Sequence, residues 1–172
     1  LVLGPDGPEH WVTPPDYDKF FPNGVPASKW KRKGYTRELL SNFAKRAFRR
    51  PVDRATTSRL AKLAESISSQ EGKTYEEGIA QAMVAILASP RFLFREEEVK
   101  RKSRRETHPY LDEYALASRL SYFLWSSMPD EELFELARKG NLRENLEPQV
   151  VRMMDDKRFK NFIGNFAGQW LH

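Results

Sequence analysis

Proline placement constrains this chain more than any other feature, because a proline ring blocks the interior of a helix and the pairing of a central strand. Six of its eleven prolines lie within residues 1–36, where four of the nine glycines also lie. That segment is therefore predicted to be an irregular arm, partly docked through its aromatic side chains: Trp11, Tyr17, Phe20, Phe21 and Trp30. The other five stand at predicted helix boundaries: Pro51, Pro90, Pro109, Pro129 and Pro148.

Between these boundaries, apolar side chains recur at the spacing of an α-helix and nowhere at the alternation of a strand. Three helices are predicted at about 36–50, 53–69 and 74–89, the third opened by a capping box of Thr74 and Glu77. Four more are predicted at about 112–127, with Asp112 as its N-cap, at 130–139, ended by Gly140, after Pro148 and from Arg158 onward. The predicted fold class is all-α, with about seven helices in two packed helical units.

The final predicted helix has two distinct faces. One narrow arc is apolar and aromatic: Phe159, Phe162, Ile163, Phe166 and Trp170. The opposite face carries small and polar residues, which would let another helix approach closely: Asn161, Gly164, Asn165 and Gly168.

Charged residues dominate 95–107, which marks the predicted boundary between the two units. The predicted division is an arm at 1–36, a three-helix unit at 37–98, a charged linker at 99–108 and a four-helix unit at 109–172. The chain opens at Leu1 and stops at His172 inside an amphipathic helix. Both ends are therefore expected to be cuts in a larger protein, with the second unit truncated at its C-terminal end.

Residues that carry chemistry are sparse. The chain has no cysteine, which removes thiolate chemistry and haem attachment through Cys-x-x-Cys-His. The three histidines, His10, His108 and His172, do not form a metal-binding spacing. Adjacent carboxylates such as Asp155 and Asp156 stand at helix starts or turns, where capping explains them. No catalytic, cofactor-binding or metal-ligating residue is predicted.

Arg119 lies between two apolar faces of the helix at 112–127. It is predicted to be partly buried and to form a structural ion pair, because a buried guanidinium needs a carboxylate or carbonyl partner. A deep pocket lined by Arg119, Tyr114 or Trp125 would indicate part of an active-site wall. A solid core there would favour a purely structural unit.

Positive charge is concentrated between Lys29 and Arg54, where ten basic residues face two acids. The net charge of this segment is +8, whereas that of the whole chain is +5, so the rest of the chain has a net charge of −3. The candidate basic surface patch lies on the first helix: Lys45, Arg46, Arg49 and Arg50. Such a surface is either a solvated helix face or, with Trp30 and Tyr35 interleaved, a nucleic-acid contact.

Several segments resemble two domain families of unknown function, over about 38–98 and 109–172. The first is carried by FAKRAFRRPV at 43–52, YEEGI at 75–79 and ILASPRFLFR at 86–95. The second is carried by LDEYALASRLSYFLWSSMPDEEL at 111–133 and NFAGQWL at 165–171. Both families are found side by side in large, secreted, planctomycete-type cytochrome-associated proteins.

This resemblance implies an exported, extracytoplasmic protein whose neighbouring domains carry c-type haem. It supplies no catalytic residues. The expected function is therefore a non-catalytic scaffold that contacts other domains of the parent protein or a protein complex. One alternative is the wall of an oxidoreductase site completed by other domains. Another is a basic nucleic-acid-binding module, although nucleic acid is the less favoured partner. No apolar run approaches the roughly 20 residues of a membrane span.

Overall fold

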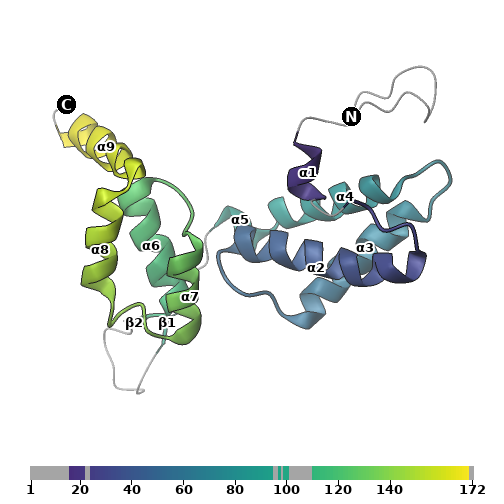
Figure 1. The fold of residues 1–172 in the computed structure, drawn as a ribbon, viewed down its shortest axis with the longest axis horizontal. Coiled ribbons are helices and arrows are strands. Elements are labelled where there is room, and N and C mark those ends of the chain that lie inside the picture. Colours follow the sequence, from purple (N-terminus) through teal and green to yellow (C-terminus); the bar gives the residue numbers. More distant parts are fainter. Residues whose placement is uncertain (1–15, 22–23, 95–96, 98, 101–109, 171–172) are drawn as a thin grey trace.

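The computed structural model describes residues 16–21, 24–94, 97, 99–100 and 110–170 of the chain, and within these ranges the fold is all-α, as predicted. Two groups of helices lie side by side (Figure 1). The described strands are two residues each, β1 (Val99–Lys100) and β2 (Tyr110–Leu111), which pair antiparallel with Val99 opposite Leu111. None of the described helices is both long enough and apolar enough to span a membrane.

The first unit consists of α1 (Tyr17–Phe20), α2 (Lys29–Phe48), α3 (Arg54–Ser68), α4 (Tyr75–Leu87) and α5 (Pro90–Leu93). Leu40 and Ala44 of α2 meet Ile79, Ala82 and Ile86 of α4 in its core, and all five side chains are at most 1% exposed. The predicted capping box opens α4: Thr74 Oγ1 accepts from the Glu77 amide at 3.2 Å, and Glu77 accepts from the Thr74 amide at 2.8 Å.

One glycine sets the distance between α3 and α4. A Cβ atom built on Gly78 would overlap the carbonyl oxygen of Ala64 and touch the side chain of Ser68. The two helices therefore approach closely only because residue 78 has no side chain.

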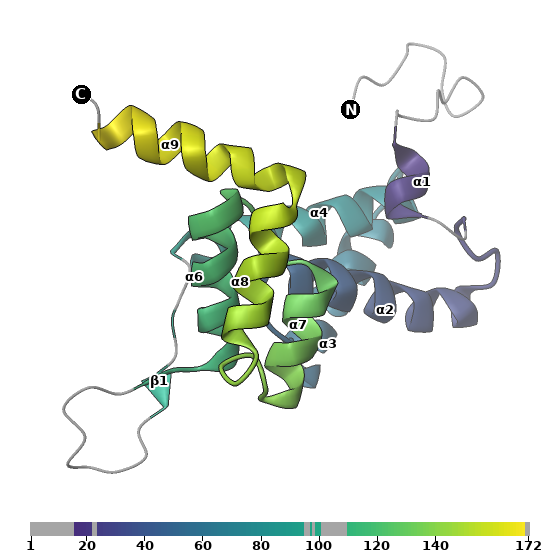
Figure 2. The same ribbon diagram turned by 60° about the vertical axis from the view of Figure 1, so that its left-hand side comes forward.

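The second unit consists of α6 (Glu113–Trp125), α7 (Glu131–Lys139), α8 (Leu146–Asp155), the 3₁₀ turn η2 (Lys157–Phe159) and α9 (Lys160–Trp170). The largest side chains of its core have no exposed surface: Trp125, Leu133, Leu142 and Met153. The indole Nε1 of Trp125 donates to the Met153 carbonyl oxygen at 2.9 Å, which satisfies its buried polar group. Helix α9 projects from the top of this unit (Figure 2).

Two helix boundaries predicted from the sequence were wrong, and one strand pair was not predicted. Helix α2 begins at Lys29, so residues 29–36 are helical and not part of an irregular arm. Their exposed basic side chains gave no apolar stripe to indicate a helix, although Lys and Arg are good helix formers.

Of the aromatic side chains expected to dock, Phe21 is 7% exposed but Trp30 is 84% exposed. Pro148 lies inside the first turn of α8, where its missing N–H costs no hydrogen bond. The strand pair β1–β2 was not predicted. Trp11 lies outside the described residues.

Candidate functional site

The end of α2 joins the two units through Arg49. Arg49 caps the helix in the left-handed conformation, with φ of 58°, which is uncommon for a residue with a side chain. It is 8% exposed. Its Nε donates to the hydroxyl oxygen of Tyr122 on α6 at 3.1 Å, and its two terminal nitrogens lie 3.4 Å from the Phe92 carbonyl oxygen. The rings of Phe92 and Tyr122 are each centred 5.5 Å from the guanidinium carbon.

Two further cations, Lys45 of α2 and Arg50 just after its cap, bridge to the second unit. Arg50 pairs with Asp112 at 3.1 Å, and their side chains are only 14% and 9% exposed. The same carboxylate caps α6, because its Oδ1 accepts from the Ala115 amide at 2.7 Å. Lys45 pairs with Glu131 of α7 at 3.0 Å and lies 5.4 Å from the centre of the Phe134 ring.

The predicted basic patch is therefore not one continuous solvated surface. Lys45, Arg49 and Arg50 are engaged by the second unit, and Arg46 alone of the four is exposed. Helical periodicity places these side chains on an outer face, but it cannot reveal that a second unit covers that face. Other basic side chains are exposed beside Trp30 at the start of α2: Lys29, Lys31 and Lys33. Nucleic-acid binding by this stretch stays an untested prediction.

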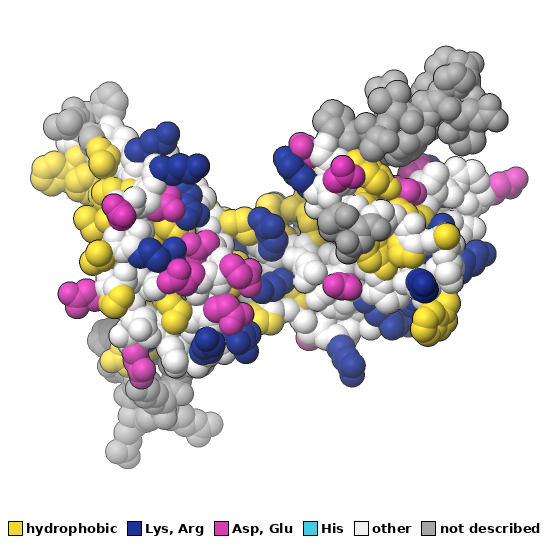
Figure 3. Space-filling model, viewed as in Figure 1, with side chains coloured by type: hydrophobic (Ala, Val, Ile, Leu, Met, Phe, Trp, Pro, Cys, Tyr) yellow, Lys and Arg dark blue, Asp and Glu magenta, His cyan; other side chains and the backbone are white. Residues whose placement is uncertain are grey.

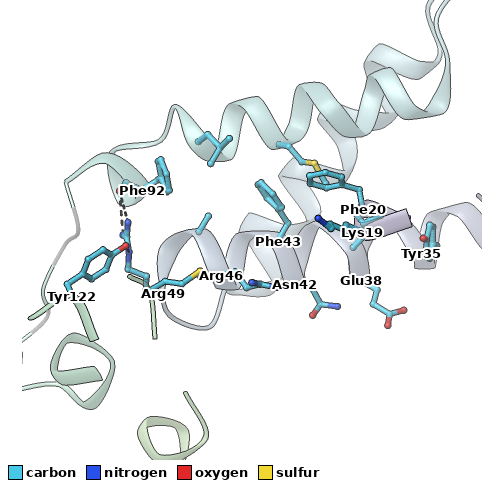
Figure 4. Close-up of a pocket in the computed structure, with 15 residues that line it drawn as sticks. Lys19, Phe20, Tyr35, Glu38, Asn42, Phe43, Arg46, Arg49, Phe92 and Tyr122 are labelled. Carbon is cyan, nitrogen blue, oxygen red and sulfur yellow. Dashed lines mark hydrogen bonds between the residues drawn. The ribbon is translucent and has the colours of Figure 1, made fainter. Parts of the chain in front are cut away.

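A groove of about 610 Å³ lies on the first unit beside the junction. Leu39 and Phe43 of α2 and Met83 and Leu87 of α4 form its apolar walls. Figure 4 shows Lys19 and Phe20 at one end, Arg49, Phe92 and Tyr122 at the other, and Phe43 between them. Three cations, Lys19, Arg46 and Arg49, line it with one acid, Glu38, so the mostly apolar groove carries a net positive charge. No sequence motif indicated it, because its walls come from helices whose packing had to be known first.

A second cavity, of about 540 Å³, lies on the other side of Arg49 and Tyr122. Tyr114, Ser118 and Arg119 of α6 line it together with Glu97. Burial raises the pKa of the Tyr114 phenol. The phenol is protonated at neutral pH, as tyrosines ordinarily are, and can donate a hydrogen bond. Of the three side chains that would indicate an active-site wall, Tyr114 and Arg119 thus line a cavity, whereas Trp125 lies in a solid core.

Arg119 forms the predicted ion pair, but not in a buried position. Its Nε donates to Glu97 Oε1 at 2.7 Å, and this hydrogen bond holds the pKa of the guanidinium above its usual value. The Arg119 side chain is 61% exposed. The predicted burial is wrong because the two apolar faces of α6 are covered unequally: Trp125 has no exposed surface, whereas Phe123 is 63% exposed.

Ionisable groups also gather around the buried Trp125, where they serve the fold. Arg158 lies 3.4 Å from the ring centre, and Asp130 accepts from Arg152 at 2.8 Å. Burial alone would raise the pKa of Asp130, but the hydrogen bonds from Arg152 and from the Leu133 amide lower it overall. Asp130 also caps α7 through the Leu133 amide at 3.0 Å, as predicted for carboxylates at helix starts.

Helix α9 leaves its aromatic face exposed. Phe159, Phe162, Phe166 and Trp170 stack in succession, with ring centres 5.3, 5.4 and 6.0 Å apart. Phe166 is 49% exposed and Trp170 78% exposed, and Phe123 of α6 extends this face. Figure 3 shows apolar side chains gathered over α9 at the upper left.

The opposite face of α9 contacts α6 through amides. Asn161 donates to the Trp125 carbonyl oxygen at 3.0 Å, and Asn165 donates to Ser126 Oγ at 2.8 Å. A Cβ atom at Gly164 or Gly168 would meet no other atom within 4 Å. The close helix approach predicted at these two glycines is therefore not present in the described structure.

The described residues contain no group of three or more His, Asp or Glu side chains placed to hold a metal ion. The three histidines lie outside the described residues.

Two family models match the chain. Residues 35–97 match the PSD5 family, described as a protein of unknown function (DUF1595). Residues 111–172 match the PSD4 family, described as a protein of unknown function (DUF1592). Neither a curated protein nor a solved structure matches the chain. The chain thus carries two adjacent domains of unknown function, as its resemblance implied.

Proposed function

We propose that this chain is a helical scaffold and interaction region of a larger exported protein, and that the neighbouring domains of that protein carry c-type haem. The adjacent DUF1595 and DUF1592 matches support the resemblance on which the parent protein is inferred. In this proposal the chain lies outside the cytoplasm, holds no haem itself, and positions redox domains without taking part in their chemistry.

The apolar face of α9 and α6 carries the proposal. Phe123, Ile163 and Trp170 are 63%, 57% and 78% exposed. Phe123 and Trp170 belong to the continuous run of ring contacts, and Ile163 follows Phe162 on the same arc of α9. Large apolar patches on soluble proteins commonly mark interaction sites, because leaving them in water forgoes about 25 cal/mol for each Å² that a partner could cover. Aromatic side chains are also the residues most enriched at the centre of interfaces.

Co-elution tests this role. The chain would be mixed with the haem-carrying domains of the parent protein, and haem absorbance would be followed through size-exclusion chromatography. Ile163→Ser should remove the chain from the haem-containing peak. The matched control is Val84→Ser, because Val84 on α4 is 54% exposed and lies away from α9. Equal elution of the two variants, or no co-elution of the native chain, would contradict the proposal.

A second candidate function is one wall of an oxidoreductase site completed by other domains, and the cavity at Tyr114 and Arg119 favours it. If so, Arg119→Gln should lower turnover by the intact protein. Arg138→Gln is its control, because Arg138 is equally exposed and pairs with Glu135 on its own helix, α7. Loss of turnover in the first variant alone would favour this candidate over the scaffold.

A further inference from the structure

We propose that the groove between α2 and α4 binds a single-chain aliphatic carboxylate, with the carboxylate between Arg46 and Arg49 and the chain running past Phe43 and Met83 toward Phe20. The volume of about 610 Å³ falls within the range of small-molecule pockets, about 300–1,000 Å³. Such pockets are mostly apolar, with a few polar groups that fix the orientation of the ligand.

The charge at one end of the groove is incompletely compensated. Arg49 is only 8% exposed, yet no carboxylate in the described part of the chain pairs with it. It contacts a phenol oxygen, a carbonyl oxygen and two rings, all of them neutral groups. A buried charge normally has a partner of opposite sign, because removing it from water is costly. An anionic ligand at this end would supply that partner.

Arg46 strengthens the same end. It stands one turn before Arg49 on α2, lines the groove, and forms no ion pair with any described residue. The C-terminal end of a helix carries partial negative charge, which alone would repel an anion. Two guanidinium groups at this end outweigh that effect, and the planar guanidinium matches a carboxylate in two-point hydrogen bonding.

The apolar walls select the remainder of the ligand. Phe43, Met83, Leu87 and Phe92 present no hydrogen-bonding side-chain group, so a polar or multiply charged ligand would lose its hydration there without compensation. Phe20 lies toward the far end of the groove, next to Lys19 (Figure 4), and is 46% exposed. An unbranched hydrocarbon chain covers these side chains and fits between two helices.

Calorimetric titration of the chain with dodecanoate tests the assignment, together with dodecanol and dodecyltrimethylammonium as probes of the same chain length. All three would be used below the concentrations at which they form micelles. Dodecanoate should bind at least tenfold more tightly than either of the others. Equal binding of dodecanol would overturn the proposal, because it would show that the groove does not recognise the carboxylate.

Three variants locate the site. Arg46→Gln should weaken dodecanoate binding about fivefold to tenfold, as expected for losing one charge-assisted contact at a partly exposed position. Arg37→Gln is the control, because Arg37 is an exposed cation of the same helix that does not line the groove. Phe166→Ser controls for adsorption to the apolar face of α9. Equal effects of Arg46→Gln and Arg37→Gln, or loss of binding in Phe166→Ser, would overturn the proposal.

Amide NMR shifts give a second measurement that does not depend on affinity. Dodecanoate should perturb the amides of Leu39, Phe43 and Met83 and leave those of α9 unchanged. Perturbation confined to α9 would refute the site. Tight binding of an apolar helical peptide to the groove, with no binding of dodecanoate, would also refute it.

Discussion

Replacing Asp112 by alanine should destabilise the chain through two separate losses. The first is the cap of α6, since Asp112 accepts from the Ala115 amide at 2.7 Å. Losing an N-cap costs about 1 kcal/mol. The second is the bridge to Arg50, whose side chain is 14% exposed against 9% for Asp112. Removing one partner of a buried ion pair costs about 3–5 kcal/mol, because the other charge stays buried. The expected total is about 4–6 kcal/mol in the free energy of unfolding.

Asp53→Ala separates these two losses. Asp53 caps α3 in the same way, accepting from the Thr56 amide at 2.8 Å, but it is exposed and forms no bridge to the second unit among the described residues. Urea denaturation followed by circular dichroism measures both variants. Asp112→Asn adds a further test, because asparagine keeps the cap and loses the charge.

The Arg50–Asp112 bridge accounts for the difference expected between Asp112→Ala and Asp53→Ala. If Asp112→Ala costs no more than Asp53→Ala, that pair does not hold the two units together. The urea transitions should be recorded at two wavelengths, because two units with separate cores can unfold in two steps. A bridge between the units predicts that Asp112→Ala separates the two steps, whereas a cap alone would shift only the transition of the second unit.

Three other predictions concern single residues. The pKa of Asp130 is lowered, so its carboxylate contributes stability above the ordinary aspartate pKa of about 3.9 and loses that contribution as the pH falls below this value. Asp130→Asn should therefore make the free energy of unfolding depend less on pH in acid. Unchanged acid unfolding would contradict this. Gly78→Ala should lower the free energy of unfolding by about 2 kcal/mol in urea denaturation, because its methyl group overlaps the Ala64 carbonyl; an unchanged midpoint would show that α3 and α4 separate freely. Arg119→Gln should leave the urea midpoint unchanged, since the pair with Glu97 is mostly in water, and a clear decrease would mean that the pair is structural.

The helices that sequence reasoning placed best are those whose signals are local. The Thr74–Glu77 capping box, the Asp112 cap of α6 and the Gly140 stop of α7 each satisfy backbone groups within one turn. Such interactions need no knowledge of the rest of the chain. The all-α class follows from them and from the helical spacing of the apolar residues.

The features that could not be predicted depend on contacts between distant segments. Arg49 has the sequence setting of a solvated helix end, but Phe92 and Tyr122, 43 and 73 positions later, cover it. The orientation of α9 was equally hidden. Both of its faces had features of a buried surface. In the structure the amide face lies against α6, through hydrogen bonds from Asn161 and Asn165. Residue spacing alone contains no information on such partners.

The way in which the two units are joined bears on both proposals. Among the described residues, the two apolar cores share no side chain, so each unit has its own hydrophobic interior. The described links between the units are largely polar, through Lys45, Arg49 and Arg50. Polar contacts depend on defined geometry and on charge, so they can change without disrupting either core.

Arg49 belongs to the junction and to the groove at once, so occupancy of one should affect the other. A carboxylate that binds the terminal nitrogens of Arg49 would leave its Nε free to keep the Tyr122 hydrogen bond. It would also place a negative charge beside Arg49, which no carboxylate of the described residues pairs with. Binding would then stabilise the state in which α2 and α6 are in contact. The size of this effect equals the difference in the free energy of ligand binding between that state and one in which the two units are apart. In a scaffold, that coupling would transmit the presence of a small ligand to the positions of the attached domains.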